Sequence, residues 1–220
     1  MATPKSEETG AKILEAALER FRTEGFENAT MRGIAAQAGV AVGAAYYYYS
    51  SKDAIVLDFY RRSNQQVQPK IEAALERVGG LQPRLIALIQ VKLEQFAAHR
   101  EVLRALLRNG ADPRHPISPF SGETREIREM DLAWFRRILE NCGISIPPDL
   151  APHLPDVLWL YQMGVIFFWI NDDSRRQERT ARLLELSAKC VVALIKVSSL
   201  PLMRPLRKTA LELIEIVKGE

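Results

Sequence analysis

The stretch from Thr30 to Lys52, TMRGIAAQAGVAVGAAYYYYSSK, has the pattern of two short helices joined by a tight turn, with a third helix beginning at its end. The hydroxyl of Thr30 can cap the first helix by accepting a hydrogen bond from an early helical N–H. Gly39 stands where that helix must end and the chain must turn, a position that often requires positive φ. Further on, Ser50-x-x-Asp53 has the form of a capping box for the third helix.

Small residues in this stretch have the spacing that lets two helices cross closely. Ala35 is followed by Gly39 four residues later, and Ala45 comes six residues after that. This spacing is typical of a helix-turn-helix, whose second helix lies in the major groove of double-stranded DNA. The stretch therefore predicts a DNA-binding head.

The residues on both sides extend the pattern. An apolar stripe precedes it: Ile13, Leu14, Ala17, Leu18 and Phe21. Three motifs then occur in register: Phe21-x-x-x-Gly25-Phe26, Thr30-x-x-x-Ile34-Ala35-x-x-x-Gly39-Val40 and Gly43-x-x-Tyr46-x-Tyr48-Tyr49-x-Ser51-Lys52-Asp53. Together they resemble the tetracycline-repressor (TetR/AcrR) family of bacterial transcription regulators over about the first quarter of the chain. Family members often carry Phe where Tyr49 stands and a polar residue where Ala41 stands.

This resemblance implies an all-α fold with an N-terminal three-helix helix-turn-helix domain and a C-terminal helical bundle. We expect residues 1–52 to bind DNA and residues 53–220 to bind a ligand and form the dimer. The implied function is that of a dimeric DNA-binding transcription regulator, a repressor released from a palindromic operator by a small, largely apolar effector. The alternative is a helical small-molecule carrier or interaction module, because a C-terminal bundle alone would look the same.

The residues predicted to contact DNA lie on the two short helices and their borders: Thr30, Met31, Arg32, Gln37, Ala41, Val42, Gly43, Ala44, Tyr46, Tyr47, Tyr48 and Lys52. Tyr46 and Tyr48 are expected to bind phosphates through their hydroxyls, and Tyr47 to reach base edges or sugar. Tyr49 is expected in the core. For Lys52, a phosphate contact and an ordinary solvated lysine both fit the sequence.

Charge does not indicate a nucleic-acid partner by itself. The net charge is +3 over 220 residues, and residues 1–52 carry equal numbers of basic and acidic side chains. Few side chains at the reading end can form paired hydrogen bonds with bases. Specificity is therefore expected to depend partly on apolar contacts and DNA shape.

Helical periodicity runs through the chain, and no stretch has the strict alternation of a strand. Pro69 is expected to bend or break the long fourth helix, three prolines mark residues 112–122 as a loop, and Ser174 can cap the ninth helix. The expected helices cover residues 6–24, 31–38, 42–48, 51–78, 82–98, 100–108, 123–141, 150–171, 175–199 and 203–217.

The eighth and ninth of these helices differ in their patterns. The helix over 150–171 is apolar nearly all round from Val157 to Ile170, whereas the helix over 175–199 has one apolar face. A helix without a polar face needs partners on both sides. We therefore expect a homodimer through these two helices, packed as a two-fold four-helix interface.

In the resembled family, the C-terminal bundle usually encloses a pocket for a small molecule. The candidate lining residues here are Phe96, His99, Leu103, Leu107, Met130, Trp134, Trp159, Gln162, Met163 and Phe167. Ordinary core packing explains each apolar member equally simply. His99 and Gln162 are more specific, because a lone polar group in an apolar pocket can orient a ligand.

Other classes of function lack support. The sequence contains no nucleophile elbow, zinc-protease motif or phosphate-binding glycine loop, so neither an enzyme nor a cofactor is expected. The three histidines share no metal-ligand spacing. Cys142 and Cys190 are expected to be buried, reduced thiols, with a disulfide or redox switch as the alternative. The absence of a signal peptide and of a long apolar span predicts a cytoplasmic protein without membrane contact.

Overall fold

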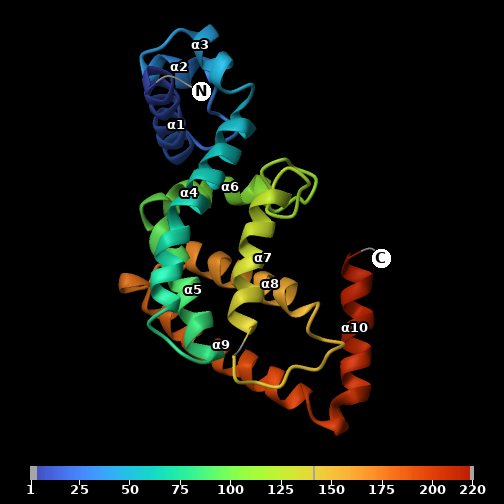
Figure 1. Ribbon diagram of the computed structural model, residues 1–220. Helices are drawn as coiled ribbons and strands as arrows, with labels where there is room; N and C mark the ends of the chain where they lie inside the picture. The colour runs from blue at the N-terminus through green and yellow to red at the C-terminus, as the bar shows by residue number, and fades with distance from the viewer. Residues whose placement is uncertain (1–3, 141, 219–220) are drawn as a thin grey trace. The chain divides into compact units, whose positions relative to one another are not determined.

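The computed structural model describes residues 4–140 and 142–218, and each regular element among them is helical. Figure 1 shows their order along the chain. The α-helices are α1 (Pro4–Glu24), α2 (Met31–Ala38), α3 (Val42–Tyr48), α4 (Lys52–Leu75), α5 (Leu81–Phe96), α6 (Arg100–Gly110), α7 (Arg125–Leu139), α8 (Leu154–Ile170), α9 (Glu178–Ser198) and α10 (Arg204–Lys218). Short 3-10 turns precede α6, α9 and α10: η1 (Ala97–His99), η2 (Arg175–Gln177) and η3 (Pro201–Met203).

The chain folds as two compact units. The first contains residues up to 66 together with residues 95–128, and the second contains residues 67–94 together with those from 129 onward. The helices α4, α5 and α7 each contribute residues to both units. The predicted boundary at residue 52, between a DNA-binding part and a ligand-binding and dimerisation part, does not coincide with the division into these two units. It stays a prediction.

In the first unit, α1 packs on α2, and α2 on α3. Ile13, Ala17 and Phe21 are completely buried on α1, and their four-residue spacing places them on one face of the helix. Ile34 of α2 and Ala45 of α3 are equally buried. Because alanine is small, α3 can approach α2 closely, and most of the other α3 residues are left at or near the surface.

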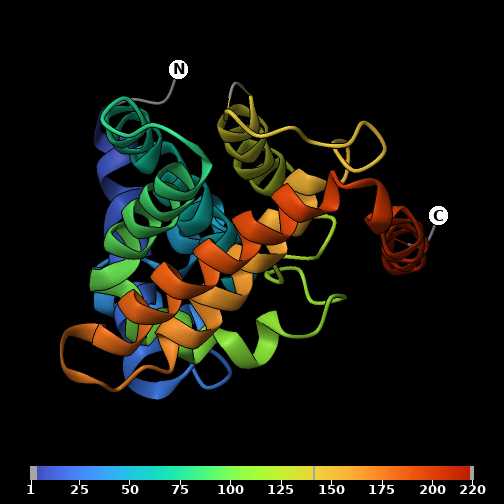
Figure 2. The ribbon, with the colours of Figure 1, turned by 90° about the horizontal axis from the view of Figure 1, so that it is seen from below.

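In the second unit, α8 and α9 lie side by side, as Figure 2 shows. Leu158 of α8 and Ala188 of α9 are completely buried. The hydroxyls of Tyr161 and Ser187 share a hydrogen bond of 2.7 Å between the two helices. This packing covers one side of each helix and leaves the other side exposed.

The beginning of α4 differs from the predicted capping box. The helix starts at Lys52, and the Ser51 hydroxyl accepts a hydrogen bond from the Ala54 amide at 3.1 Å. Ser51 therefore caps the helix, and the assignment of this role to Ser50 was wrong by one residue. Pro69 lies inside a continuous helix, so it does not break α4.

The beginning of α9 also has a cap that the sequence did not indicate. The buried carboxylate of Asp172 accepts hydrogen bonds from the Thr180 amide at 2.8 Å and the Thr180 hydroxyl at 2.6 Å. Ser174, the predicted cap, accepts one longer bond from the Arg179 amide at 3.2 Å. The helix consequently begins at Glu178 rather than at residue 175.

The sequence predictions also concern the two cysteines, one helix end and membrane spans. Cys142 is buried as predicted, but Cys190 is exposed on α9, so its predicted burial was wrong. Asn141, at the end of the predicted helix 123–141, lies outside the described residues, as do residues 1–3. Among the residues that the structure describes, no helix has both the length and the hydropathy needed to cross a membrane.

Candidate nucleic-acid interface

The turn between α2 and α3 is fixed by residues at its own ends. The Thr30 hydroxyl accepts a hydrogen bond from the Gly33 amide at 3.1 Å and so caps α2. Gly39 ends the helix at φ 68°, in the left-handed region. The Val40 amide then bonds the Ala35 carbonyl at 3.0 Å, which is typical of a glycine-terminated helix. The turn therefore directs the chain into α3 without help from distant residues.

The helix α3 has one buried and one exposed face. Ala45 is buried, whereas Val42, Tyr46 and Tyr47 are exposed, and Tyr47 shows 83% of its surface to solvent. A Cβ atom added at Gly43 would meet no heavy atom within 4 Å. The exposed face thus has a flat end near Gly43 and an aromatic end.

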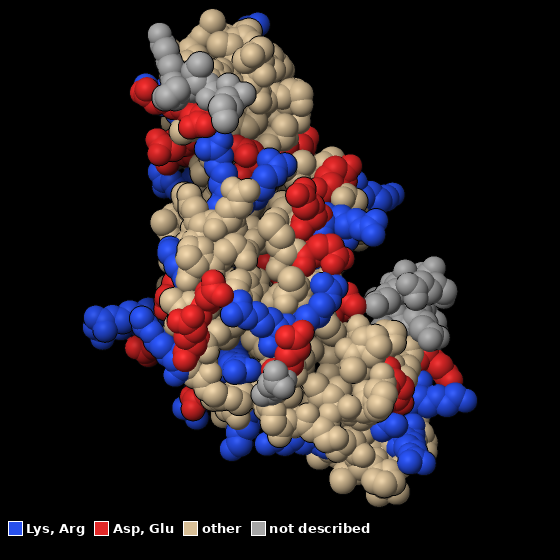
Figure 3. Space-filling model, viewed as in Figure 1, with Lys and Arg blue, Asp and Glu red and all other residues tan. Residues whose placement is uncertain are grey.

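The other predicted contact residues surround this face. Arg32, Gln37 and Ala41 are exposed, and Ala44 is partly exposed. The Met31 side chain is buried, so only its backbone is available to a partner. In the view of Figure 3, the surface over α3 consists mostly of uncharged residues. The structure thus brings these residues to one region, and their contacts with DNA stay predictions.

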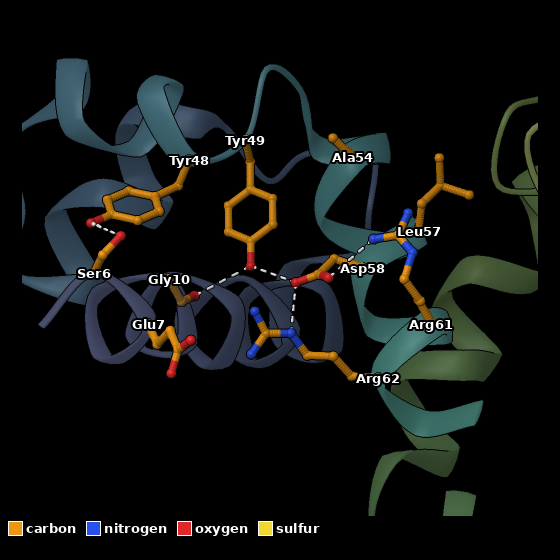
Figure 4. Close-up of a pocket in the computed structure, with 10 residues that line it drawn as sticks. All are labelled: Ser6, Glu7, Gly10, Tyr48, Tyr49, Ala54, Leu57, Asp58, Arg61 and Arg62. Atoms are coloured by element: carbon orange, nitrogen blue, oxygen red, sulfur yellow. Dashed lines mark hydrogen bonds and ion pairs between the residues drawn. The ribbon is translucent and has the colours of Figure 1, made fainter. Parts of the chain in front are cut away.

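Tyr48 and Tyr49 anchor the end of α3, as Figure 4 shows. The Tyr48 hydroxyl donates a hydrogen bond to the Ser6 hydroxyl of α1 at 3.2 Å. The buried Tyr49 donates to Asp58 of α4 at 2.7 Å, as expected for a core residue. Burial raises the pKa of the Tyr49 hydroxyl, and its hydrogen bond to Asp58 raises that pKa further. Tyr49 therefore stays protonated and keeps donating to Asp58.

These anchoring residues border an open cleft of about 450 Å³ between α1 and α4. The Asp58 carboxylate at its wall also accepts from Arg62 at 2.8 Å and Arg61 at 3.3 Å. None of the residues predicted to bind a ligand lines this cleft. Hydrogen bonds from Tyr48 and Tyr49 across this cleft link the end of α3 to α1 and α4.

Lys52 has an internal role that the sequence did not indicate. Its ammonium donates to the carbonyl oxygens of Phe26 at 2.7 Å and Glu27 at 3.1 Å. It also lies 4.7 Å from the centre of the Phe26 ring. These bonds use two of its three N–H groups. The phosphate contact of Lys52 stays a prediction, and it would use the third N–H group.

The residues predicted to line a ligand pocket are distributed over both units. Phe96, His99, Leu103 and Leu107 belong to the first unit, where the rings of Phe96 and His99 both contact Phe59, with centres 6.1 and 5.1 Å away. Burial lowers the pKa of His99. This packing leaves His99 half-buried beside Phe59 in the first unit.

The remaining pocket candidates belong to the second unit: Met130, Trp134, Trp159, Gln162, Met163 and Phe167. Trp134, Trp159 and Gln162 are buried, and Met130 and Met163 are partly buried. Phe167 is 57% exposed on α8. The prediction that it faces the interior of the bundle was therefore wrong for this unit. The Trp134 indole donates to Gln68 at 2.6 Å.

Sequence reasoning missed two residues beside Gln162. Gln162 donates to the Asp131 carboxylate at 3.2 Å, and the same carboxylate forms an ion pair of 2.7 Å with Lys92. One sequence feature could have indicated a buried polar site. It is the position of Lys92 on the apolar face of α5, next to the buried Ile89 and Leu93. Among the described residues, no group of three His, Cys, Asp or Glu side chains could hold a metal ion.

Comparison with known proteins agrees with this architecture. The chain is 26% identical to the transcriptional regulator BetI of Agrobacterium fabrum over 66% of this chain and 68% of that protein. It is 28% identical to the transcriptional repressor SCO4008 of Streptomyces coelicolor over 73% and 78%. The transcriptional regulator FadR of Bacillus subtilis, solved with stearoyl-CoA, has a similar fold, with a TM-score of 0.65 at 17% identity over 81% of this chain and 96% of that one.

Two family models match the chain. The model described as "Bacterial regulatory proteins, tetR family" covers residues 13–59, which include α2 and α3. The model "Tetracyclin repressor-like, C-terminal domain" covers residues 84–211, more than half of the chain. The all-α fold with an N-terminal helix-turn-helix is therefore confirmed. The chain belongs to the tetracycline repressor (TetR) family of DNA-binding transcription regulators.

Proposed function

We propose that this protein is a dimeric repressor that binds a palindromic operator and releases it when a small effector binds. The exposed face of α3 carries the proposal. In this face, small residues at Gly43 and Ala44 are followed by the exposed rings of Tyr46 and Tyr47. A helix of this kind can enter the major groove closely while its tyrosines reach the backbone and base edges.

The contacts with DNA follow from the positions of the side chains. Tyr46 and Tyr48 bind phosphates, the latter after its hydroxyl turns from Ser6. Tyr47 reaches bases or sugar, and Arg32 and Gln37 supply the nearby polar contacts. The start of α2, at Thr30 and Met31, holds a phosphate through its amides. Because the head is nearly neutral, these local contacts replace a broad basic surface.

The dimer forms through the exposed sides of α8 and α9. Leu160 and Phe167 are exposed on α8, and Leu186, Leu194 and Val197 on α9. The two residues on α8 are seven apart, and those on α9 are eight and three apart, which places each set along one side of its helix. Two copies packed about a two-fold axis would cover these residues in a four-helix interface. A two-fold dimer matches an operator with two equivalent half-sites.

The direction of regulation is proposed from the relatives. SCO4008 is a repressor, and the FadR structure contains stearoyl-CoA, an acyl compound with a long apolar part. We place the effector of this chain in the second unit, whose buried Trp134, Trp159 and Gln162 were expected to line a pocket. The protein acts in the cytoplasm, where bacterial DNA is found.

One experiment tests the regulator directly. Fragments of the genome that encodes the protein are mixed with the full chain, and bound fragments are recovered and sequenced. The proposal predicts a palindromic site near a promoter, and less transcript from that promoter in vitro when the protein is added. Increased transcription would identify an activator, and recovery of fragments without a shared sequence would contradict operator binding.

A further inference from the structure

Three helices of the second unit meet at a buried polar cluster. Lys92 of α5 is 3% exposed, Gln162 of α8 is 1% exposed, and Asp131 of α7 is also buried. The Lys92 ammonium lies 2.7 Å from Asp131 Oδ1, and the Gln162 amide donates to Asp131 Oδ2 at 3.2 Å. One carboxylate therefore joins a lysine and a glutamine that lie far apart in the sequence.

This cluster is not complete within the described residues. Apart from Asp131, they provide no hydrogen-bond acceptor for Lys92 Nζ, although an ammonium has three N–H groups. They also provide no donor for the buried Gln162 Oε1. A buried polar atom without a hydrogen bond costs stability. The two side chains thus lack an acceptor beside Lys92 and a donor beside Gln162.

The charges in the cluster restrict what can complete it. Lys92 and Asp131 neutralise each other, so an additional carboxylate or ammonium would add an unpaired buried charge. An uncharged group that both accepts and donates hydrogen bonds avoids this cost. A primary carboxamide has that form, because its carbonyl can accept from Lys92 while its N–H donates to Gln162.

The neighbours on the same helices are aromatic. Trp134 and Phe135 follow Asp131 by three and four residues, and Trp159 precedes Gln162 by three, so each shares a helix face with the cluster. All three are buried, and the Phe135 ring centre lies 5.9 Å from Lys92 Nζ. A ligand that reaches the cluster would therefore need a flat, apolar body.

We propose that Lys92, Asp131 and Gln162 recognise the effector, and that the effector is an apolar, aromatic molecule with one uncharged group of the carboxamide type. This inference rests on the proposed function, because it assigns the chemistry of the effector site. It also gives the largely apolar effector one defined polar group.

Four probes with one aromatic ring test the chemistry: benzamide, benzoate, benzyltrimethylammonium and toluene. Their binding to the full chain without DNA is measured by ligand-observed NMR. Benzamide should bind at least about tenfold more tightly than the other three, the factor that one hydrogen bond of about 1.4 kcal/mol produces. Equal binding of the four probes, or no binding of benzamide, would overturn the proposal.

Variants then locate the site. Gln162→Leu should remove the preference for benzamide, whereas Lys196→Met, at an exposed position of α9, should keep it. Lys92→Met alone would strand the Asp131 carboxylate in the interior, so Lys92→Met/Asp131→Leu replaces the pair together. This double variant should lose the preference, and its melting temperature should stay close to that of the wild type, because removal of the buried charges offsets the hydrogen bond that Gln162 loses.

Two results for the double variant would contradict the assignment. A much lower melting temperature would show that the pair supports the fold, and a retained benzamide preference would place the site elsewhere. Neither result bears on the operator, since the fragment selection described above uses no effector. A recovered operator with no benzamide preference would therefore reject this inference alone.

Discussion

Both α3 and α9 expose apolar side chains, but the kinds of residue differ. The exposed face of α3 combines small residues with the hydroxyl-bearing rings of Tyr46 and Tyr47. The exposed face of α9 is aliphatic, with Leu194 68% exposed between Leu186 and Val197. Tyrosine suits a hydrated, polar partner such as DNA, whereas leucine and valine gain most from a dry protein interface. The difference suggests one surface for DNA and another for a second copy of the chain.

The largest effect is expected from Leu194→Glu, which places a charge in the proposed dimer interface. Burying a leucine contributes about 2 kcal/mol, and a two-fold interface contains the residue twice, so the dimer dissociation constant should rise about a thousandfold. Analytical ultracentrifugation measures this constant. Leu202→Glu is the control, because Leu202 is 88% exposed outside α8 and α9. Equal dimerisation of both variants would show that α9 is not the interface.

The next effect is expected from Gly43→Leu, which fills the flat end of α3. The added side chain would meet no atom of the protein near its Cβ, but it would separate α3 from the groove. Affinity for the operator should fall about a hundredfold, or about 2.7 kcal/mol, with circular dichroism unchanged. Gly43→Ala should lose much less. Fluorescence anisotropy measures both, and full affinity of Gly43→Leu would exclude close approach at this position.

A smaller effect is expected from Asp172→Asn, which weakens the cap that orients α9. Loss of hydrogen bonds to a buried charge should lower the free energy of unfolding by about 2 kcal/mol at pH 7. Burial raises the pKa of Asp172, but hydrogen bonds from Thr180 and Ser174 outweigh it, and the folded pKa lies below its ordinary value. The stabilisation is therefore complete above that ordinary value, about 3.9, and is lost as the pH falls below it.

Urea unfolding at several pH values measures this difference. The gap between the wild type and Asp172→Asn should narrow below about pH 4, where the wild-type carboxylate begins to lose its advantage. Glu185→Gln, at an exposed position of α9, is the control and should change little. A gap that stays constant from pH 7 to pH 3 would mean that the charge of Asp172 does not stabilise the turn.

The smallest effect is expected from Tyr49→Phe, which removes one buried hydrogen bond beneath α3. Asp58 keeps its bonds to Arg61 and Arg62, so the free energy of unfolding should fall by only about 1 kcal/mol. Tyr46→Phe, at an exposed position, should leave stability unchanged. Thermal unfolding compares them, and an equal loss in both would show that the Tyr49–Asp58 bond does not anchor α3.

The bounds of α2 and α3 were predicted correctly because local residues determine them. Thr30 caps α2 three residues from its partner amide, and Gly39 supplies the left-handed backbone that ends it. The start of α9 depends instead on Asp172 reaching Thr180, eight residues along the chain. Arg176 and Gln177 adopt positive φ there without being glycine, a conformation that residue type does not favour. Such a turn cannot be predicted from local pattern.

The candidate sites show the same contrast. Tyr49 was correctly assigned to the core, because the resemblance to the family implies a buried aromatic residue at this position. The polar cluster in the second unit needs α5, α7 and α8 to meet, and nothing in the sequence around Lys92 identifies Asp131 as its partner. Likewise, α8 is apolar nearly all round, so its pattern indicated burial on several sides. It did not indicate that the side carrying Phe167 would be exposed in this chain.

The central claim is that the exposed face of α3 lies against DNA, and photo-crosslinking tests it most directly. Tyr47→p-benzoylphenylalanine places a photoreactive ring on this face, and the same group at Phe120 places it on an exposed loop of the first unit. Irradiation of each protein bound to the recovered operator should crosslink position 47 to DNA, whereas position 120 should form no crosslink. Bound protein that crosslinks from position 120 and not from position 47 would contradict the account.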